Sequence, residues 1–447
     1  MKLRRKFLLV LTILGFSLWL GALPALAKLP GFDYTKMSDM SDFDPNQPTI
    51  QSGDTIKIGL VESFSGPAAI VGQWYRFPTH WVAYDINKRG GIYVDGKMKK
   101  IQIILGNSMG KPSVVKKVAE RLILRDKVDI LWGTSGSHNT KILAQVAKKY
   151  KKILMNPMSL ADALHDGKNF NRYTFRTTLN TTMAGNSLAY FYAKRPETKF
   201  YILNQDYLLG HSMAAAFKNG LKKFKPDAKI VGETYHPLFT KDFAPYVTKV
   251  KATDAEVVFT ADWDPDSANL IRQAHGLGLR IPFAHIYADS MYSLLAIGPQ
   301  AGVGQVNAND YMISVDTPTN KHFIKIWNDR WTKGYAKPYD NVTFKWPASI
   351  FGRTTEATYW LMDVIRRAGS TDAEKIIKVW EGDKWIGLAS TLEMRACDHQ
   401  VIRDLFATEF VFPNPYHSDA ASYGKPVIMP REIAEPPVPK DLKRCNQ

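Results

Sequence analysis

Short apolar runs alternate with longer amphipathic segments from about residue 55 onwards. Runs rich in Ile, Val and Leu are typical of buried strands, whereas apolar residues spaced by three or four are typical of helices. The predicted strands cover 56–61, 101–105, 128–132 and 153–155. The predicted helices cover 67–88, 112–125 and 139–149, and Pro78 is expected to kink or shorten the first of them. This alternation predicts a parallel sheet with helices on both faces.

The same pattern starts again after a bridging stretch at 172–182 and predicts a second α/β lobe. Its strands are predicted at 200–203, 230–234, 257–260 and 283–287, and its helices at 210–223, 242–251 and 265–277. A third section has a predicted strand at 312–315 and helices at 321–333, 349–368 and 372–380, and is expected to complete the first lobe. Because ligands of open α/β sheets bind beyond the carboxyl ends of the strands, two such lobes predict a cleft between them.

The N-terminus has the pattern of an export signal. Four basic residues precede an apolar run at 7–23, and Ala25-Leu26-Ala27 has the small-x-small spacing of a cleavage site. A membrane anchor is the alternative, but the run is short for a bilayer and contains two glycines. We therefore predict a signal peptide at 1–27, an N-terminal extension at 28–54, and an exported protein that is not a lipoprotein, since no cysteine lies near the cleavage site.

Charge and cysteine content further limit the classes of protein to which the chain can belong. The formal charge is +17, but the lysines are dispersed and the protein is expected to be exported, so we interpret the charge as a solvated surface and predict no nucleic-acid partner. The two cysteines, Cys397 and Cys445, predict a disulfide that fastens a proline-rich C-terminal tail at 413–447. The ten histidines show no metal-ligand spacing, and neither a metal nor a cofactor is predicted.

The stretch "LWGTSGSHNT" at 131–140 joins a predicted strand to a predicted helix. It is one residue short of the G-x-S-x-G turn that presents a serine nucleophile in hydrolases. His138 is adjacent to Ser137 and therefore poorly placed for proton transfer, and no acid and histidine follow in a suitable order. A small-residue turn before a helix instead offers unpaired N–H groups to an anion. The alternative role of Ser137 is that of the helix N-cap.

Several stretches resemble one family. "IKIGLVESFSGPAAIVG" at 56–72, "AERLILRDKVDILWG" at 119–133 and "NQDYLLGHSMAAAFKNGLKK" at 204–223 are similar to the branched-chain amino-acid-type (type I) periplasmic substrate-binding proteins of ABC transporters. The resemblance runs in order from about residue 55 to 405. It implies an α/β fold of two Rossmann-like lobes with a three-crossing hinge. The first lobe would comprise 55–178 and 313–390, and the second 179–312 and 391–412.

The resemblance also implies which residues bind the solute. Ser137 matches the main carboxylate-binding serine of the family, and Ser135 and Thr134 are its neighbours. Ser159 matches a small residue that holds the head group, and Trp263 matches a tyrosine that covers the solute. Tyr207 lies beside the family's tyrosine-glycine element, whose aromatic position is Leu209 in this chain.

One feature of the family is altered. Amino-acid receptors pair the ammonium group of the solute with an acid of the second lobe, and Tyr287 is the nearest match for that acid. Asp289 or Asp262 can replace it only if the side chain reaches the cleft. Without such an acid, aromatic or aliphatic carboxylates and amides are the expected solutes.

The resulting prediction is a monomeric periplasmic protein that binds a small carboxylate-bearing solute by closure of two lobes and delivers it to an ABC permease in the inner membrane. A ligand-sensing partner of a membrane receptor, with the same cleft, is the alternative. An exported enzyme is disfavoured because no catalytic residues can be assigned.

Overall fold

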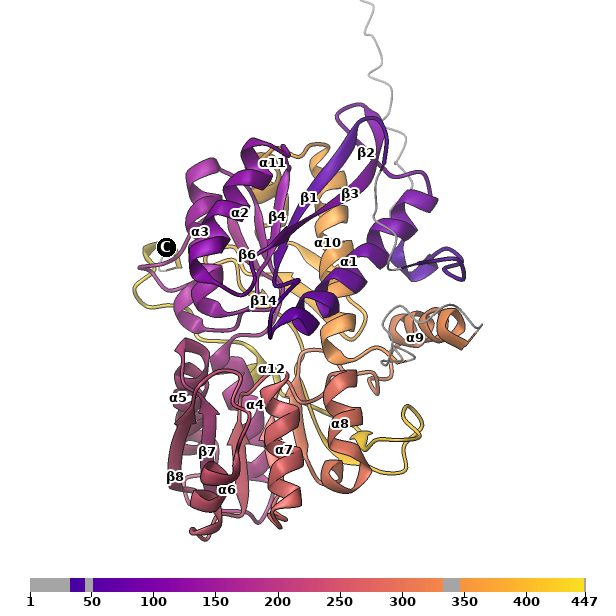
Figure 1. The fold of residues 1–447 in the computed structure, drawn as a ribbon. Helices are drawn as coiled ribbons and strands as arrows, with labels where there is room; N and C mark the ends of the chain where they lie inside the picture. Colours follow the sequence, from indigo (N-terminus) through magenta and orange to yellow (C-terminus); the bar gives the residue numbers. More distant parts are fainter. Residues whose placement is uncertain (1–32, 45–50, 333–345, 446–447) are drawn as a thin grey trace, which may run out of the picture. The chain divides into compact units, whose positions relative to one another are not determined.

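The two predicted lobes each contain one sheet in the computed structural model, which describes residues 33–44, 51–332 and 346–445 (Figure 1). The predicted signal peptide lies outside the described residues and stays a prediction. The residues from Tyr34 onwards belong to one unit, which contains both sheets.

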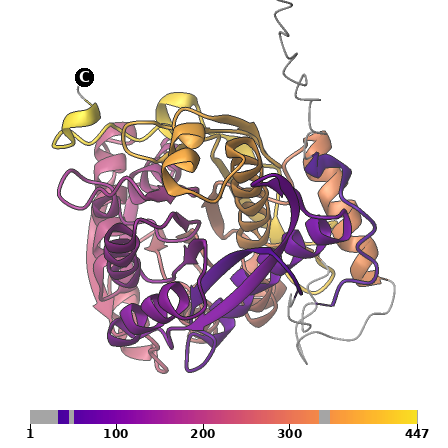
Figure 2. The same ribbon diagram turned by 90° about the horizontal axis from the view of Figure 1, so that it is seen from above.

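The first sheet has the strand order β2-β3-β1-β4-β5-β6 and is parallel except for the β2–β3 pair. Its strands are β1 (Thr55–Glu62), β2 (Ile92–Val94), β3 (Lys97–Asn107), β4 (Ile130–Gly133), β5 (Leu154–Asn156) and β6 (Thr174–Arg176). Helices α2 (Pro112–Leu124) and α3 (Ser137–Tyr150) pack against one face, while α1 (Ala69–Lys88) and α10 (Ser349–Ala368) pack together on the other side of the sheet (Figures 1 and 2). Helix α1 continues through Pro78.

The second sheet has the order β16-β15-β11-β10-β9-β7-β8, and β17 also pairs with β15. Its strands are β7 (Lys199–Gln205), β8 (Lys229–His236), β9 (Val257–Thr260), β10 (Phe283–His285), β11 (Val306–Asn309), β15 (Phe406–Val411), β16 (Ser422–Tyr423) and β17 (Val427–Ile428). Helices α4 (Thr181–Ala193) and α5 (Leu208–Phe224) form one apolar core with the sheet. Helices α6 (Ala244–Lys251), α7 (Asp266–Gly276) and α8 (Met291–Gly302) form a second core on the opposite face.

The strand predicted at 312–315 is wrong, because this segment is a turn that follows β11. Tyr311, Met312 and Ile313 are buried where the chain leaves the second sheet, so their apolar character reflects burial beside the hinge. The true strand has the sequence VNAN, and its two asparagines concealed it from the hydrophobic pattern.

The chain passes between the two lobes three times, as the family resemblance implies. It leaves the first sheet after β6, returns after β11, and enters the second sheet again at β15. The returning segment contains α9 (Pro318–Thr332), α10, α11 (Ala373–Trp380) and a small sheet of β12 (Lys384–Ile386), β13 (Thr391–Met394) and β14 (Val401–Ile402).

Asp310 connects the three crossings. It accepts hydrogen bonds from the Thr178 hydroxyl at 3.0 Å and from the Leu179 N–H at 3.1 Å, both on the first crossing. It also lies 3.3 Å from a guanidinium nitrogen of Arg353 on α10 and 3.7 Å from one of Arg403 on the third crossing. The hinge is therefore built around a buried carboxylate.

The described part of the N-terminal extension packs on the first lobe. A short 3-10 helix (η1, Tyr34–Lys36) precedes a loop in which the ring of Phe43 lies 5.3 Å from Trp81 of α1, between ring centroids. The Ser38 N–H donates to Asp85 of α1 at 2.8 Å. Two further 3-10 helices are η2 (Asp162–Leu164) and η3 (Lys443–Cys445).

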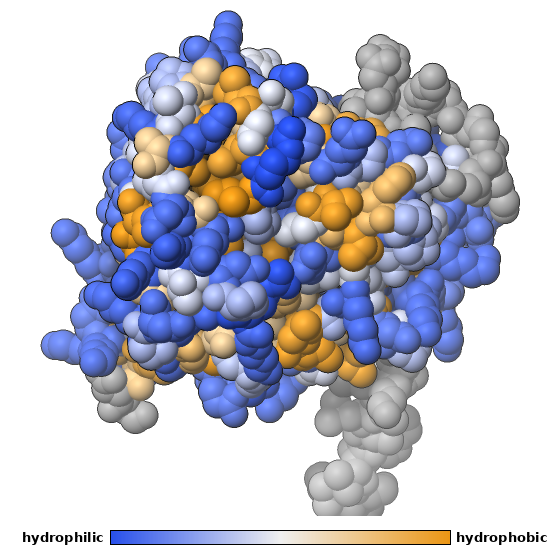
Figure 3. All heavy atoms as spheres, turned by 90° about the horizontal axis from the view of Figure 1, so that it is seen from below, coloured by the Kyte–Doolittle hydropathy of each residue, from blue (hydrophilic) through white to orange (hydrophobic). Residues whose placement is uncertain are grey.

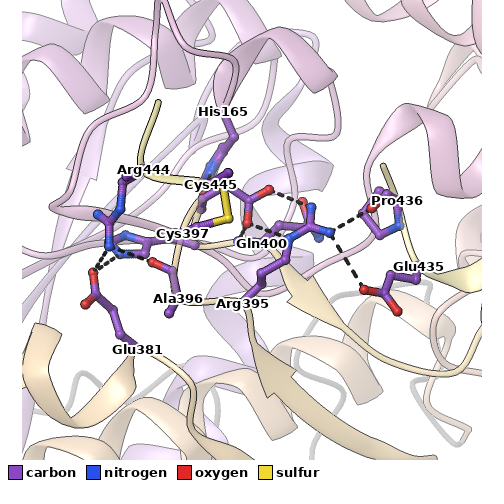
Figure 4. Close-up of a disulfide and its surroundings, with 12 residues drawn as sticks. His165, Glu381, Arg395, Ala396, Cys397, Gln400, Glu435, Pro436, Arg444 and Cys445 are labelled. Atoms are coloured by element: carbon purple, nitrogen blue, oxygen red, sulfur yellow. Dashed lines mark hydrogen bonds and ion pairs between the residues drawn. A yellow bond between two sulfur atoms is a disulfide. The ribbon is translucent and has the colours of Figure 1, made fainter. Parts of the chain in front are cut away.

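The predicted disulfide between Cys397 and Cys445 is present (Figure 4). Arg444 beside it donates to Glu381 at 2.6 Å and to the Ala396 carbonyl at 2.7 Å, and Arg395 donates to the Pro436 carbonyl at 2.7 Å. A short helix of the tail, α12 (Arg431–Ala434), packs on α4. The tail is therefore fixed to the body of the protein at several points.

Polar side chains predominate on the face shown in Figure 3, and apolar side chains form separate patches there. Within the described ranges, no helix is both long and apolar enough to cross a bilayer. The same residues contain no cluster of three or more His, Cys, Asp or Glu side chains that could hold a metal ion.

Candidate functional site

The carboxyl ends of strands from both sheets face a single cavity. Residues that follow β4 and β5 line it from the first lobe, and residues that follow β7, β9 and β10 line it from the second. The space between its walls measures about 390 Å³, part of which is open to solvent. Its lining residues are Val71, Trp74, Tyr75, Ser135, Gly136, Ser137, Met158, Ser159, Tyr207, Leu209, Trp263, Tyr287 and Ile350.

The serine turn, residues 133–137, connects β4 to α3 and lines the cavity from the first lobe. Gly133 has a φ of +135°, and a Cβ there would lie 2.2 Å from the Val61 carbonyl, so only glycine fits. Gly136 has a φ of +80° and directs the chain into α3. These two glycines explain why the turn is made of small residues.

Ser137 is the first residue of α3, and Gly136 occupies the N-cap position. The first helical N–H with a backbone partner is that of Thr140, which donates to Gly136 at 3.0 Å. Within the described residues, the N–H groups of Ser137 and His138 have no hydrogen-bond acceptor. The Ser137 Oγ accepts from the Ala161 N–H at 3.4 Å, which leaves the hydroxyl hydrogen available for a solute.

Ser159 and Ser135, two other polar residues predicted for the site, have internal partners. The Ser159 hydroxyl donates to the Thr134 carbonyl at 2.8 Å and accepts from Thr140 at 2.7 Å, so its hydrogen is already used. The Ser135 Oγ lies 3.3 Å from the Met158 sulfur, and no histidine contacts it among the described residues. Thr134 is fully buried and does not line the cavity.

The second lobe contributes three aromatic walls. The indole N–H of Trp263 donates to the Tyr207 hydroxyl at 2.8 Å, so the two rings are fixed as a pair. The Tyr287 hydroxyl donates to the Met158 carbonyl of the first lobe at 3.4 Å, and His138 of the first lobe meets the Tyr207 ring edge-on. The two lobes thus contact each other across the cavity.

Sequence reasoning missed Trp74 and Tyr75, which line the cavity from α1. They lie three and four residues beyond Val71 and therefore share its face of the helix. The helical spacing of these three apolar residues was the usable signal in the sequence. Met158, Leu209 and Ile350 complete the apolar lining.

The two candidate acids do not line the cavity. Asp262 is fully buried and accepts from the Gln205 N–H at 2.8 Å and from the His236 ring at 2.7 Å. Burial lowers the pKa of His236, but the hydrogen bond and charge of Asp262 outweigh it, and the pKa lies above its usual value. Asp289 accepts from Tyr423 of the tail at 3.0 Å, and burial raises its pKa.

Two further acids hold the loop that carries Trp263. Asp264 accepts hydrogen bonds from three serine hydroxyls, including that of Ser267 at 2.7 Å, and Asp266 accepts from Gln205 at 2.8 Å. Burial raises the pKa of each carboxyl group to about 6. The acids of this loop are therefore structural supports behind the aromatic wall.

No residue in the cavity lining has a charged side chain. Helix α5 begins at the cavity like α3, and its first backbone-bonded N–H is that of His211, which donates to Tyr207 at 3.1 Å. The positive ends of two helix dipoles thus approach the same space from opposite lobes. Such an arrangement suits an anion with an apolar body.

Comparison with known proteins agrees with this fold. A family model described as periplasmic binding protein matches residues 55–414. The chain is 26% identical over 387 residues to Leu/Ile/Val-binding protein homolog 4 of Brucella melitensis, covering 83% of this chain and 88% of the relative. The leucine-, isoleucine-, valine-, threonine- and alanine-binding protein of Brucella ovis, in a closed conformation, has a similar structure, with a TM-score of 0.74, 22% identity, and coverage of 86% of this chain and 98% of that one. A solute binding protein of Rhodopseudomonas palustris BisB5, in complex with 3,4-dihydroxybenzoic acid, has a TM-score of 0.70 and 20% identity, with coverage of 83% and 96%.

Proposed function

Because the chain belongs to the periplasmic binding protein family, we propose that it binds a small organic carboxylate without an ammonium group and delivers it to an ABC permease. The observation that carries this proposal is a cavity with no charged side chain at which two helix N-termini meet. The protein acts by binding and closure rather than by making or breaking bonds.

The carboxylate is proposed to dock on the serine turn. The Ser137 hydroxyl and the N–H groups at the start of α3 supply hydrogen-bond donors without a compensating positive side chain. Hydrogen bonds to a charged group are stronger than those between neutral groups, so a few well-placed donors are sufficient. Ser159 is proposed to support the turn and not to contact the solute, because its hydroxyl hydrogen already bonds Thr134.

The body of the solute is proposed to lie between aromatic side chains. Trp74 and Tyr75 of the first lobe and Tyr207, Trp263 and Tyr287 of the second surround the remaining space. A planar ring or a branched alkyl chain fits this lining, whereas an α-ammonium group would lose its hydration without gaining an ionic partner. The benzoate-type solute in the Rhodopseudomonas palustris relative is consistent with such a body, and the amino acids named for the Brucella ovis relative are the competing class.

Closure is proposed to follow docking on the first lobe. Asp310 at the hinge joins all three crossings, so the lobes can rotate about a common point. The contacts from Tyr287 to Met158 and from Tyr207 to His138 exist only when the lobes approach each other. We propose that a monomer in this closed form is the species that the permease in the inner membrane recognises.

Matched pairs of solutes test the proposal. Leucine and 4-methylpentanoate, or phenylalanine and 3-phenylpropanoate, differ only in the amino group, and benzoate adds a rigid ring. We expect calorimetry and thermal unfolding of the ligand-stripped protein to detect the deaminated acids and to give at least about tenfold weaker binding of the amino acids, a difference of about 1.4 kcal/mol. Tighter binding of the amino acids would overturn the proposal.

A further inference from the structure

Glu62 lies directly behind the serine turn and has no role in the site described so far. It is the last residue of β1, and its side chain is only 1% exposed. One carboxylate oxygen accepts from the Ser63 N–H at 2.8 Å, and the other accepts from the Ser135 N–H at 2.6 Å. Ser135 therefore faces the cavity and bonds Glu62 through its backbone.

The charge of Glu62 has no cationic neighbour among the described residues that would neutralise it. Burial raises the pKa of the carboxyl group to about 7, although hydrogen bonds from Ser63, Ser135 and Thr134 favour the charged form. Tyr75 of α1 interacts with the charge of Glu62 and is neutral, because burial raises its pKa well above the usual value. His138 of α3, three positions along the chain from Ser135, has a pKa that burial lowers. Glu62 is thus the acid nearest to the serine turn.

A docked carboxylate brings a second negative charge to the same turn, at Ser137, two residues from the Ser135 N–H that Glu62 holds. Two carboxylates that share a poorly solvated site do not both remain ionised, and the group with the higher pKa takes up a proton. A carboxylate solute has a pKa near 4, far below that of Glu62. The proton therefore goes to Glu62.

We propose that Glu62 takes up a proton when the carboxylate of the solute docks on the serine turn, so that capture of an anionic solute is coupled to proton uptake. This inference rests on the proposed carboxylate solute. Glu62 acts as a positioning residue: it holds the Ser135 N–H in both protonation states, and its charge sets the pH range over which the turn accepts an anion. A neutral residue would hold the same N–H without this pH dependence.

The test is calorimetric titration of the protein from pH 5.5 to 8.5 with benzoate, 3-phenylpropanoate and 4-methylpentanoate, each compared with its own neutral amide. For the carboxylates we expect a Kd that is constant at low pH and rises by up to about tenfold per pH unit above pH 7. Repetition in buffers of different ionisation enthalpy should reveal uptake of up to one proton at pH 8. The amides should show neither effect.

Two variants identify the group that takes up the proton. Glu62→Gln should bind the carboxylates with a Kd independent of pH and without proton uptake. His138→Gln can change the Kd itself through the lost contact with Tyr207, but it should keep the pH profile and the proton uptake of the unchanged protein. Proton uptake that persists in Glu62→Gln or disappears in His138→Gln would overturn the inference, as would a flat profile in the unchanged protein. If Glu62→Gln does not fold, the buffer comparison on the unchanged protein and on His138→Gln still decides the matter. Binding of amino acids but of no carboxylate at any pH would instead contradict the proposed function itself.

Discussion

Replacement of Asp310 by asparagine should destabilise the protein far more than its single lost charge suggests. Asp310 and Glu356 are the two acids of a fully buried cluster whose two bases are Arg353 and Arg403. With Asp310 neutral, Arg353 and Arg403 lose the carboxylate that they share. Breaking a buried pair in this way costs about 3–5 kcal/mol, because the remaining charge stays out of water.

The corresponding change in melting temperature follows from the size of the protein. An unfolding entropy of about 2.1 cal/mol/K per residue gives a shift of about 3–6 °C for this free-energy loss if the two lobes unfold together. Scanning calorimetry of Asp310→Asn measures this shift directly. The result also reports on the hinge, since Asp310 bonds residues on the first crossing as well as both arginines.

A matched control separates this effect from loss of charge in general. Asp316 lies six positions along the chain and forms an ion pair with Lys321, but its side chain is 77% exposed. An exposed pair contributes about 0–1 kcal/mol, so Asp316→Asn should shift the melting temperature by about 1 °C or less. Equal shifts in the two variants would refute the argument that the hinge depends on a buried charge balance.

Three other predictions concern the site, the tail and pH. Ser137→Ala should weaken carboxylate binding by about 10–100-fold, the value of a hydrogen bond to a charged group. Ser135→Ala should change the Kd by less than about threefold, because the Ser135 hydroxyl faces Met158. The opposite ranking of the two variants in calorimetry would contradict the docking proposal. Replacement of Cys397 and Cys445 by serine opens a loop with a sequence separation of 48 and should reduce the free energy of unfolding in guanidinium by up to about 4 kcal/mol. An unchanged midpoint of the guanidinium transition would show that the other contacts of the tail are sufficient to stabilise it. Burial raises the folded-state pKa of Asp264 to about 6 from 3.8, so the protonated carboxyl group contributes at most about 3 kcal/mol of stability, which is present below pH 3.8 and is lost as the pH rises through 6. The melting temperature should fall over this range less steeply in Asp264→Asn than in the unchanged protein. Equal slopes in the two proteins would argue against this contribution.

Most of the fold could be predicted from the sequence, because the spacing of apolar residues along the chain reflects which side of each strand or helix is buried. Strand β9 is buried along its whole length and β1 at every position except Lys57, and their ends were predicted to within a residue or two. The serine turn was also predictable, since a small-residue segment between a strand and a helix has few alternative roles. β11 was missed because its two asparagines are buried and hydrogen-bonded, which the hydrophobic pattern does not register.

The electrostatics of the site were not predictable because they depend on distant partners. Asp262 is paired with His236, 26 positions away, and Asp289 with Tyr423, 134 positions away. No local pattern indicates that these acids point away from the cavity. The role of Glu62 was likewise hidden, because its partner Ser135 is 73 positions away on another strand end.

The packing of α10 on α1 has a consequence for the order in which the chain is made. Trp81 of α1 packs on Trp327 of α9, with ring centroids 4.9 Å apart, and Phe77 of α1 packs on Phe351 of α10 at 5.8 Å. The residues that cover α1 are therefore synthesised some 250 residues after α1 itself. The second sheet likewise lacks β15 until residue 411. Neither lobe can be completed from a contiguous stretch of chain, and an emerging polypeptide displays an aromatic surface for most of its synthesis. We therefore expect the two lobes to finish folding together, late and after release, and the unfinished chain to be a substrate for holding chaperones.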